Sequence, residues 1–250
     1  MPKFEVPMPR ASSIVALAAA AILSMGLSAR QADAASISVV SDVNTVQNGS
    51  GNYPIFSNIL GTSDSVLFSR NVGQFADLSS YYATTHGATV TSSSAALTGL
   101  FLSGYDLLVL TANFGSAFTY TASELLAIAD FSTAGGDILM IAEANTSDTA
   151  SLDSYNSVLS AVGSSIRFSD RIAASANDTA LAASDISAIS DSFSAVYYNN
   201  LTGGRSIARD GNGNTFLAYE RLSPVPLPAG LPLLAAALAS AVVIRRRRAA

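Results

Sequence analysis

The sequence predicts a three-layer α/β sandwich with a mostly parallel sheet, on the basis of two apolar runs and the helix pattern between them. Residues 107–110 form a continuous apolar run, which is typical of a strand buried on both faces of a parallel sheet. Residues 138–141 have the same character. Because a parallel crossover is right-handed and covers the sheet with helices, residues 105–144 predict two neighbouring parallel strands in a layered domain.

Three shorter segments before this unit fit the same architecture. Residues 37–40 are apolar enough for a first strand, and residues 66–69 for a second. Between them, residues 53–60 predict a short helix that ends before Gly61.

Two further helices have recognisable start and stop signals. Thr121 and Glu124 fit a capping box, in which each side chain satisfies a free backbone N–H, and Gly135 supplies the left-handed residue after the helix. The apolar face of this helix holds Leu125, Ile128 and Phe131. Residues 152–162 predict the other helix, which stops at Gly163. Its inward positions are Leu152, Tyr155, Val158, Leu159 and Val162.

The end of the domain has a different, antiparallel pattern. Residues 166–168 predict one more strand, and residues 206–209 and 215–220 predict a β-hairpin at the sheet edge. Residues 210–214 between them are Asp-Gly-Asn-Gly-Asn, and the Gly and Asn residues tolerate positive φ. Residues 173–192 fit either a helix or a surface insertion.

The first 34 residues have the composition of an export signal. Lys3 and Arg10 form a basic start, residues 14–27 form an apolar core, and the small residues that end at Ala34 form a cleavage site. The mature domain is therefore expected to span residues 35–223, beginning at Ala35. An uncleaved N-terminal anchor is the alternative, although 14 apolar residues are short for a membrane span.

The C-terminal segment, residues 224–250, combines a short motif, an apolar run and a basic cluster. The motif is Val225, Pro226, Leu227, Pro228 and Ala229, and the cluster is Arg245, Arg246, Arg247 and Arg248. In this order the segment resembles the VPLPA-type PEP-CTERM sorting signals of Gram-negative bacteria. The resemblance implies recognition by an exosortase-type processing enzyme, a transient inner-membrane anchor, and final location at the cell surface or outside the cell.

The physical properties of this segment agree with a transmembrane helix. Residues 224–244 carry no charge, and at about 1.5 Å per residue they can just cover the hydrocarbon core of a bilayer, about 30 Å thick. Prolines restrict the dependable helix to residues 233–244. The four arginines favour the cytoplasmic side, which leaves the VPLPA motif at the outer face. An ordinary tail anchor, or a core helix with a basic end, is the alternative.

The composition of the mature region excludes several classes of function. Residues 35–223 contain six arginines, no lysine and 16 acidic residues, a net charge of −10. This acidic surface argues against nucleic acid or anionic lipid as partner. The chain has no cysteine, which excludes disulfides, thiolate metal sites and a cysteine nucleophile.

The order of elements also resembles the class I glutamine-amidotransferase-like domains of flavodoxin-like topology. The matching pieces, about 40 residues, are residues 105–110, the helix ending in Gly135 and Gly136, and the strand at 138–141. Catalytic members of that superfamily carry a cysteine just after the last of these strands. Here the positions are Ala142, Glu143, Ala144 and Asn145. The resemblance therefore implies the fold and argues against the chemistry.

Few residues qualify as catalytic groups. His86 is the only histidine, and a Ser-His-Asp triad would need it beside an activated serine. Ser116 follows a predicted strand, where α/β proteins often place their sites, but no G-x-S-x-G pattern surrounds it. Both residues are more simply interpreted as exposed loop positions. We therefore predict no catalytic residue and no cofactor.

Two clusters of polar and acidic residues are candidates for calcium ligands. Asp210, Asn212 and Asn214 match the first half of a calcium loop, but position twelve is Arg221, so a hairpin turn explains them better. Glu143 follows a predicted buried strand, with Asp148 and Asp153 close in sequence. Because acidic loop residues are usually only solvated, we predict no metal site.

These observations favour a non-catalytic exported protein that binds or builds in the cell envelope or extracellular matrix, with a polysaccharide or envelope component as partner class. The alternative is a secreted hydrolase that uses serine chemistry around His86 or a pair of carboxylates. The two classes differ in whether the fold places His86 beside both a serine and an acid.

Overall fold

The computed structural model describes residues 34–47, 50–70, 72–145, 149–173, 177–178, 193–195 and 197–222. The VPLPA motif, the apolar run after it and the four arginines lie outside these residues, as do the predicted export signal before Ala34, Asp148 and most of residues 173–192. Within the described part of the chain, no helix has both the length and the hydrophobicity needed to cross a membrane.

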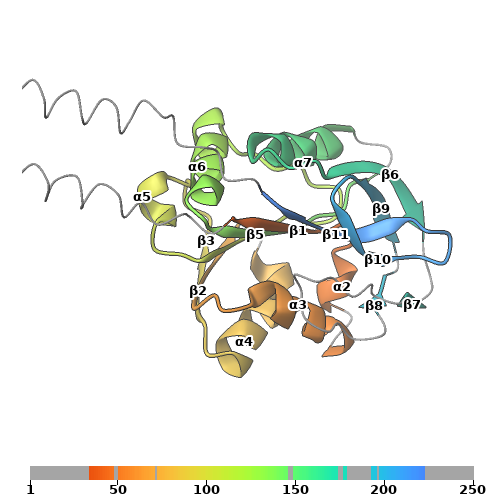
Figure 1. Ribbon diagram of the computed structural model, residues 1–250, viewed down its shortest axis with the longest axis horizontal. Helices are drawn as coiled ribbons and strands as arrows, with labels where there is room; N and C mark the ends of the chain where they lie inside the picture. The colour runs from red at the N-terminus through yellow and green to blue at the C-terminus, as the bar shows by residue number, and fades with distance from the viewer. Residues whose placement is uncertain are drawn as a thin grey trace, which may run out of the picture. The chain divides into compact units, whose positions relative to one another are not determined.

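Helices and strands alternate along the first two thirds of the domain (Figure 1). The helices are α2 (Asn44–Gln47), α3 (Tyr53–Leu60), α4 (Ala76–Thr85), α5 (Gly99–Leu102), α6 (Ala122–Thr133) and α7 (Thr149–Ala161), with 3-10 turns at Ser50–Asn52 and Val72–Phe75. The strands are β1 (Ser36–Val40), β2 (Ser65–Ser69), β3 (Thr89–Ser93), β4 (Leu107–Thr111), β5 (Asp137–Ile141), β6 (Arg167–Ala173), β7 (Asn177–Asp178), β8 (Phe193–Ser194), β9 (Tyr197–Thr202), β10 (Arg205–Arg209) and β11 (Thr215–Arg221).

The described strands form one nine-stranded mixed sheet and a separate β7–β8 pair. The order of the main sheet is β3-β2-β4-β5-β1-β11-β9-β6, with β10 paired to β11. The first five strands in this order are mutually parallel, and β11 runs antiparallel to β1. Leu108 lies opposite Ile138 in the β4–β5 pair, which confirms that the two long apolar runs are neighbouring parallel strands.

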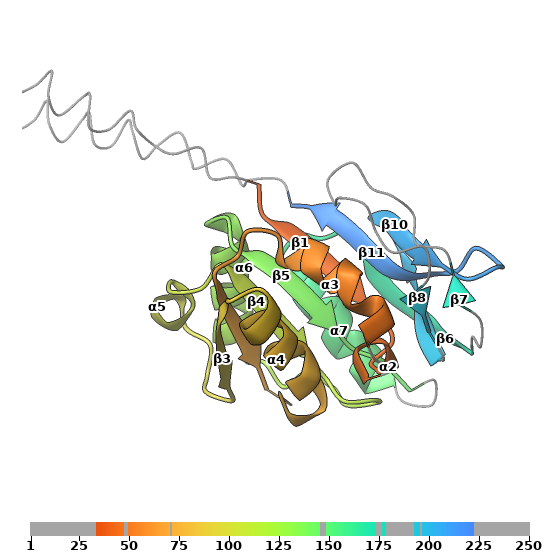
Figure 2. The same cartoon turned by 90° about the horizontal axis from the view of Figure 1, so that it is seen from below.

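Helices cover both faces of the sheet, as the apolar strands require. Figures 1 and 2 show α6 and α7 on one face and α2, α3 and α4 on the other. Alternate strand residues supply the two hydrophobic clusters: Leu108 and Met140 belong to the α6–α7 side, whereas Val109 and Ile141 belong to the opposite side. The predicted α/β class with a mostly parallel sheet is confirmed.

The helix signals of the sequence are present in the structure. Thr121 and Glu124 form the complete capping box of α6, and Gly135 after this helix has φ 99°. Helix α7 begins three residues earlier than the sequence predicts, and its buried positions include Tyr155, Val158 and Leu159.

The predicted hairpin forms, but its expected place at the sheet edge is wrong. Strands β10 and β11 are antiparallel and joined by residues 210–214. However, β11 lies inside the sheet, with β1 on one side and β9 and β10 on the other. Its central residues Phe216, Leu217 and Ala218 are buried, and they divide between the two hydrophobic clusters. A strand buried on both faces is more stable between two neighbours than at an exposed edge.

Asp33–Pro224 is one compact unit. The main sheet and both hydrophobic clusters lie within residues 34–222. Because this part of the chain contains its own core, residues 35–223 are expected to fold without the flanking segments.

Candidate functional site

The sheet has one position where α/β proteins commonly bind ligands. After β2 the chain moves outward to β3, whereas after β4 it moves the opposite way to β5, and β2 and β4 are neighbours. Many α/β proteins bind ligands where the direction of winding reverses in this way, at the carboxyl ends of the strands. Arg70 immediately follows β2, so it lies at this switch point.

Arg70 has an unusual backbone conformation at this point. Its φ is 61°, the one positive φ of a non-glycine residue in the described part of the chain. The Arg70 N–H donates to the Ser93 carbonyl (2.9 Å), and the Thr111 hydroxyl donates to the Arg70 carbonyl (2.8 Å). Left-handed backbone costs about 1–2 kcal/mol for such a residue, so contacts on both sides have to stabilise it.

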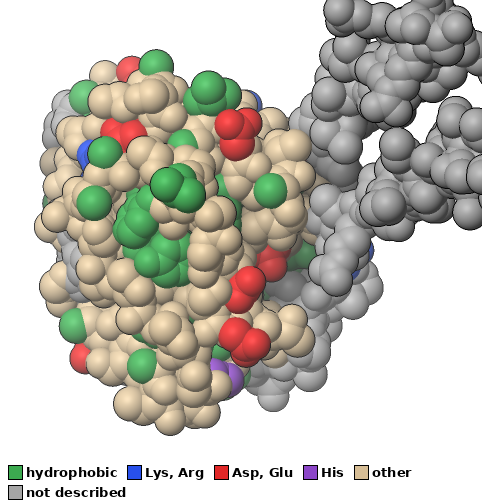
Figure 3. Space-filling model, turned by 90° about the vertical axis from the view of Figure 1, so that its left-hand side faces the viewer, with side chains coloured by type: hydrophobic (Ala, Val, Ile, Leu, Met, Phe, Trp, Pro, Cys, Tyr) green, Lys and Arg blue, Asp and Glu red, His purple; other side chains and the backbone are tan. Residues whose placement is uncertain are grey.

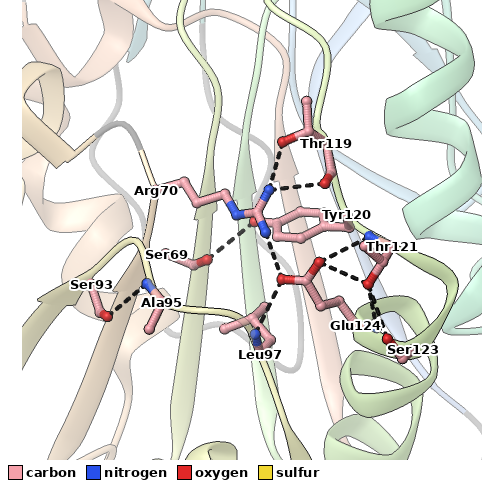
Figure 4. Close-up of polar contacts among 10 residues, drawn as sticks. All are labelled: Ser69, Arg70, Ser93, Ala95, Leu97, Thr119, Tyr120, Thr121, Ser123 and Glu124. Carbon is pink, nitrogen blue, oxygen red and sulfur yellow. Dashed lines mark hydrogen bonds and ion pairs between the residues drawn. The ribbon is translucent and has the colours of Figure 1, made fainter.

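The Arg70 guanidinium is held by groups of the β4–α6 connection, as Figure 4 shows. Nη1 donates to the carbonyl (3.0 Å) and the hydroxyl (2.6 Å) of Thr119, and Nη2 pairs with Oε1 of Glu124 at 2.5 Å. The guanidinium also lies over the Tyr120 ring, 4.5 Å from its centroid. Nε is buried without a hydrogen-bond partner.

Glu124 is the buried half of this ion pair. Its Oε1 also accepts from the Leu97 N–H (3.1 Å), and its Oε2 accepts from the N–H and the hydroxyl of Thr121 (both 2.9 Å). Burial alone would raise the pKa of Glu124, but the hydrogen bonds from Thr121 and Leu97 and the charge of Arg70 outweigh it, so the pKa is lowered. The carboxylate is therefore held in its ionised form.

Tyr120 is the third side chain of this cluster, after Arg70 and Glu124. Burial raises its pKa to about 12, against the smaller opposing effects of the Ser69 hydroxyl and of Arg70. Its hydroxyl lies 3.3 Å from Ser69 Oγ at the end of β2. At neutral pH the ring is therefore a neutral, partly buried contact for the guanidinium.

Arg70, Tyr120 and Glu124 form a clamp, that is, a set of contacts that holds two elements of the fold together. The charge of Arg70 is neutralised by Glu124, and both Glu124 oxygens accept hydrogen bonds from the chain itself. An anionic ligand would therefore have to displace Glu124 before it could pair with Arg70. The Arg70–Glu124 pair joins the end of β2 to the first turn of α6.

The sequence analysis missed Arg70, although the sequence contains a signal for it. Arg70 directly follows the predicted strand at 66–69, and it is the only Lys or Arg between Ala35 and residue 166. A single cation at the carboxyl end of a buried strand predicts an acidic partner, although the sequence does not identify Glu124 as that partner.

His86 lies elsewhere, after α4 and before β3, which places it at the amino end of the strands. Its Nε2 is 3.0 Å from the Ser57 hydroxyl, which itself lies 2.6 Å from the Tyr81 hydroxyl. The ring also makes an edge contact with Tyr81. No carboxylate among the described residues bonds the imidazole. The fold thus gives His86 a serine but no acid to orient it.

Ser116 follows β4, at the opposite end of the strands from His86. Its carbonyl accepts from the Tyr155 hydroxyl at 2.6 Å, and its N–H donates to the Asn113 carbonyl at 2.9 Å. Because these backbone contacts fix a turn, Ser116 is part of the loop structure. The two predicted candidates for serine chemistry are not brought together.

Replacing His86 with Ala is expected to lower the free energy of unfolding by less than about 1 kcal/mol, because the exposed ring makes one hydrogen bond and edge contacts with Tyr81 and Tyr82. Urea denaturation of residues 35–223 measures this. Tyr82→Ala serves as positive control, since that ring is fully buried and its loss should cost about 3–5 kcal/mol. A loss of several kcal/mol for His86→Ala would contradict the interpretation.

Asp210, Asn212 and Asn214 form a turn between β10 and β11. Oδ1 of Asp210 accepts from the N–H groups of Asn212 (2.9 Å) and Asn214 (2.8 Å), and Oδ2 accepts from the Asn214 amide (2.9 Å) and the Tyr198 hydroxyl (2.5 Å). Burial would raise the pKa of Asp210, but these hydrogen bonds lower it. The carboxylate stabilises the turn, as the hairpin interpretation expects.

The end of β5 holds the other acidic candidates. Glu143 is buried at 1% exposure, whereas Asp153 is exposed on α7. Within the described residues no group of three or more His, Asp or Glu side chains could hold a metal ion. The Gly115 N–H donates to the Glu143 carbonyl (2.8 Å), and the Ala144 N–H to Oδ1 of the buried Asn199 (2.7 Å). Backbone contacts thus fix the conformation of the segment that follows β5.

The predicted processing positions fall partly within the described residues. Ala34 is half-buried, and Ala35 is buried beside β11, with its carbonyl accepting from the Leu222 N–H at 2.7 Å. A cut between these two residues must therefore precede folding, because a protease needs extended, accessible backbone.

Comparisons of the chain with protein-family models, with curated proteins and with solved structures gave no match.

Proposed function

We propose that this chain is an exported protein of the cell envelope or extracellular matrix of a Gram-negative bacterium, and that its α/β domain binds a partner or has a structural role without catalysis. In this proposal, residues 230–244 anchor the chain transiently in the inner membrane. An exosortase-type enzyme then cuts at the VPLPA motif, and the domain is released to the cell surface or beyond. The support is the VPLPA motif followed by a short apolar run and four arginines.

The Arg70–Glu124 pair is the observation that supports a non-catalytic domain. The switch point at the carboxyl ends of β2 and β4 is where an α/β enzyme would place reacting groups. Here that position holds a guanidinium and a carboxylate that neutralise each other. Hydrolysis at neutral pH needs an activated nucleophile or a metal-bound water, and an internal ion pair supplies neither.

We also propose the flavodoxin-like variant of the α/β fold. The order β3-β2-β4-β5 corresponds to positions 2-1-3-4 of the flavodoxin order, and β1 occupies the fifth position. The N-terminal strand thus stands where a flavodoxin-like chain would place a later one. An additional N-terminal strand before an otherwise flavodoxin-like unit accounts for this order.

The sorting proposal predicts a defined C-terminus. Intact-mass analysis of the protein recovered from its native host is expected to show a chain that begins at Ala35 and ends between Val225 and Ala229. Replacing the VPLPA motif by five alanines should leave the tail attached and the protein in the membrane fraction, while the apolar run stays unchanged. Finding the four arginines on the extracellular form would contradict the proposal.

A second candidate function, a secreted hydrolase, rests on the 3.0 Å contact between Ser57 Oγ and His86 Nε2. Against it, Ser57 lies inside helix α3, and its hydroxyl also donates to the Tyr53 carbonyl (3.1 Å). Ester and glycoside substrates, tested on residues 35–223 and on its Ser57→Ala and His86→Ala variants, decide between the two candidates. Turnover that both variants abolish without unfolding would establish the hydrolase and refute our proposal.

A further inference from the structure

Strand β3 forms one end of the main sheet and pairs only with β2 among the described strands. The Thr89 N–H donates to the Asp64 carbonyl, and the Ser93 carbonyl accepts from the Arg70 N–H, so odd-numbered residues of β3 direct their backbone groups toward β2. In a strand, the backbone groups of alternate residues point in opposite directions. The N–H and C=O groups of Val90 and Ser92 therefore point away from the sheet.

The free edge of β3 lacks the features that normally prevent pairing. Its sequence, Thr-Val-Thr-Ser-Ser, contains no charge and no proline, and its register with β2 is continuous. Natural proteins usually protect an exposed edge with charges, prolines or bulges. The opposite end of the sheet has such protection, because β6 contains the charged Arg167 and a register shift.

An apolar groove accompanies this edge. It has a volume of about 640 Å³. Its lining includes Thr89, Thr91, Thr98, Leu100, Phe101 and Tyr105. Leu100 on α5 is 89% exposed, the highest value among the large hydrophobic side chains described. Figure 3 looks onto this end of the molecule and shows hydrophobic side chains gathered on it. This end of the sheet therefore has the outward backbone groups of Val90 and Ser92 beside exposed apolar surface, the two requirements for addition of a strand.

We propose that the occupant is a second copy of this chain, with the two β3 strands paired antiparallel about a two-fold axis at Thr91. In this register Val90 of each copy faces Ser92 of the other, and the outward N–H and C=O groups form four hydrogen bonds. The pairing is self-complementary, as a two-fold interface requires. Leu100 and Phe101 of each copy then cover the added strand.

The charge distribution permits this pairing although the domain carries a net charge of −10. The edge residues themselves are uncharged. Two exposed carboxylates, Asp64 and Asp106, lie near the amino end of the strand. Antiparallel pairing places the two amino ends at opposite ends of the junction, so these carboxylates do not face each other. Salt screens the repulsion between the two negatively charged domains, so a higher salt concentration should strengthen the dimer.

Sedimentation analysis of residues 35–223 tests the proposal. A monomer–dimer equilibrium is expected at micromolar to millimolar concentrations, and the amides of Val90 and Ser92 should exchange more slowly as the dimer forms. Ser92→Pro removes an outward N–H and no bond of the sheet, and Leu100→Asp places a charge in the groove. Each should weaken self-association by about tenfold or more.

Leu126→Asp provides the matched control, because it places the same charge at a 62% exposed leucine of α6. This variant should dimerise like the parent. Circular dichroism spectra identical to the parent establish that the variants are folded. A domain that stays monomeric at all concentrations, including one that instead binds an extended peptide, overturns the proposal. So does a dimer that neither Ser92→Pro nor Leu100→Asp weakens.

Discussion

The Glu124→Ala variant is expected to lose about 3 kcal/mol of unfolding free energy. The change leaves the Arg70 guanidinium, whose side chain is 21% exposed, without its counter-ion. It also leaves the buried Leu97 N–H without an acceptor and breaks the capping box of α6 with Thr121. Urea denaturation of residues 35–223 measures the difference.

Asp130→Ala is the matched control for this variant. Asp130 is an exposed acid on the same helix, so its removal changes the net charge equally and should shift the unfolding free energy by no more than about 0.5 kcal/mol. If Glu124→Ala were as stable as Asp130→Ala, the Arg70–Glu124 pair would not be the clamp that we describe.

The same pair predicts a dependence on pH. Because the pKa of Glu124 is lowered in the folded state from an ordinary value of 4.5, its ionised form stabilises the fold above that value. This stability is lost as the pH falls through the lowered pKa. The difference between the parent and Glu124→Gln should therefore be largest near neutral pH and shrink in acid. A difference that grows on acidification would contradict this assignment.

The Gly203→Ala variant is expected to lose more than about 3 kcal/mol, or not to fold at all. Gly203 has φ 74° in the turn between β9 and β10, and a Cβ there would lie 2.1 Å from the Ser165 carbonyl oxygen. This oxygen belongs to the backbone that leads into β6, so it cannot move aside as a flexible side chain would. Strands β6 and β9, which are paired, would have to separate.

The Gly213→Ala variant separates the cost of the left-handed backbone from the cost of the contact with Ser165. Gly213 also has a positive φ, 87°, but a Cβ there would meet nothing within 4 Å. Its substitution should cost only the left-handed backbone penalty, about 1–2 kcal/mol. Soluble yield and urea denaturation compare the two variants. Equal losses at both positions would mean that the contact with Ser165 has no role.

The sequence was sufficient to predict the centre of the fold, because the centre has the strongest patterns. The runs at 107–110 and 138–141 are apolar at every position, and such strands are buried on both faces. The capping box of α6 was predictable for a local reason, since both of its partners lie within four residues. Local signals of this kind do not depend on the tertiary structure.

The elements that escaped prediction lack a periodic apolar pattern. Strand β3 contains one aliphatic residue, Val90, among threonines and serines. Helix α4 buries only Leu78 and Tyr82. The position of β11 between β1 and β9 depends on pairing between the two ends of the domain, which no local pattern encodes. For the same reason the Arg70–Glu124 pair, 54 residues apart in the chain, was not predictable from motifs.

The pairing of β1 with β11 also determines the order in which the domain can assemble. Strand β1 is made first, yet one of its edges finds its partner only when Arg221 has been synthesised, since Ser36 pairs with Arg221. Contacts between residues so distant in sequence slow folding, because the loop must close before the contact forms. Until then the nascent domain has an open sheet edge and an incomplete core. In the export that we propose, this delay would keep the domain incompletely folded until its last strand has been made.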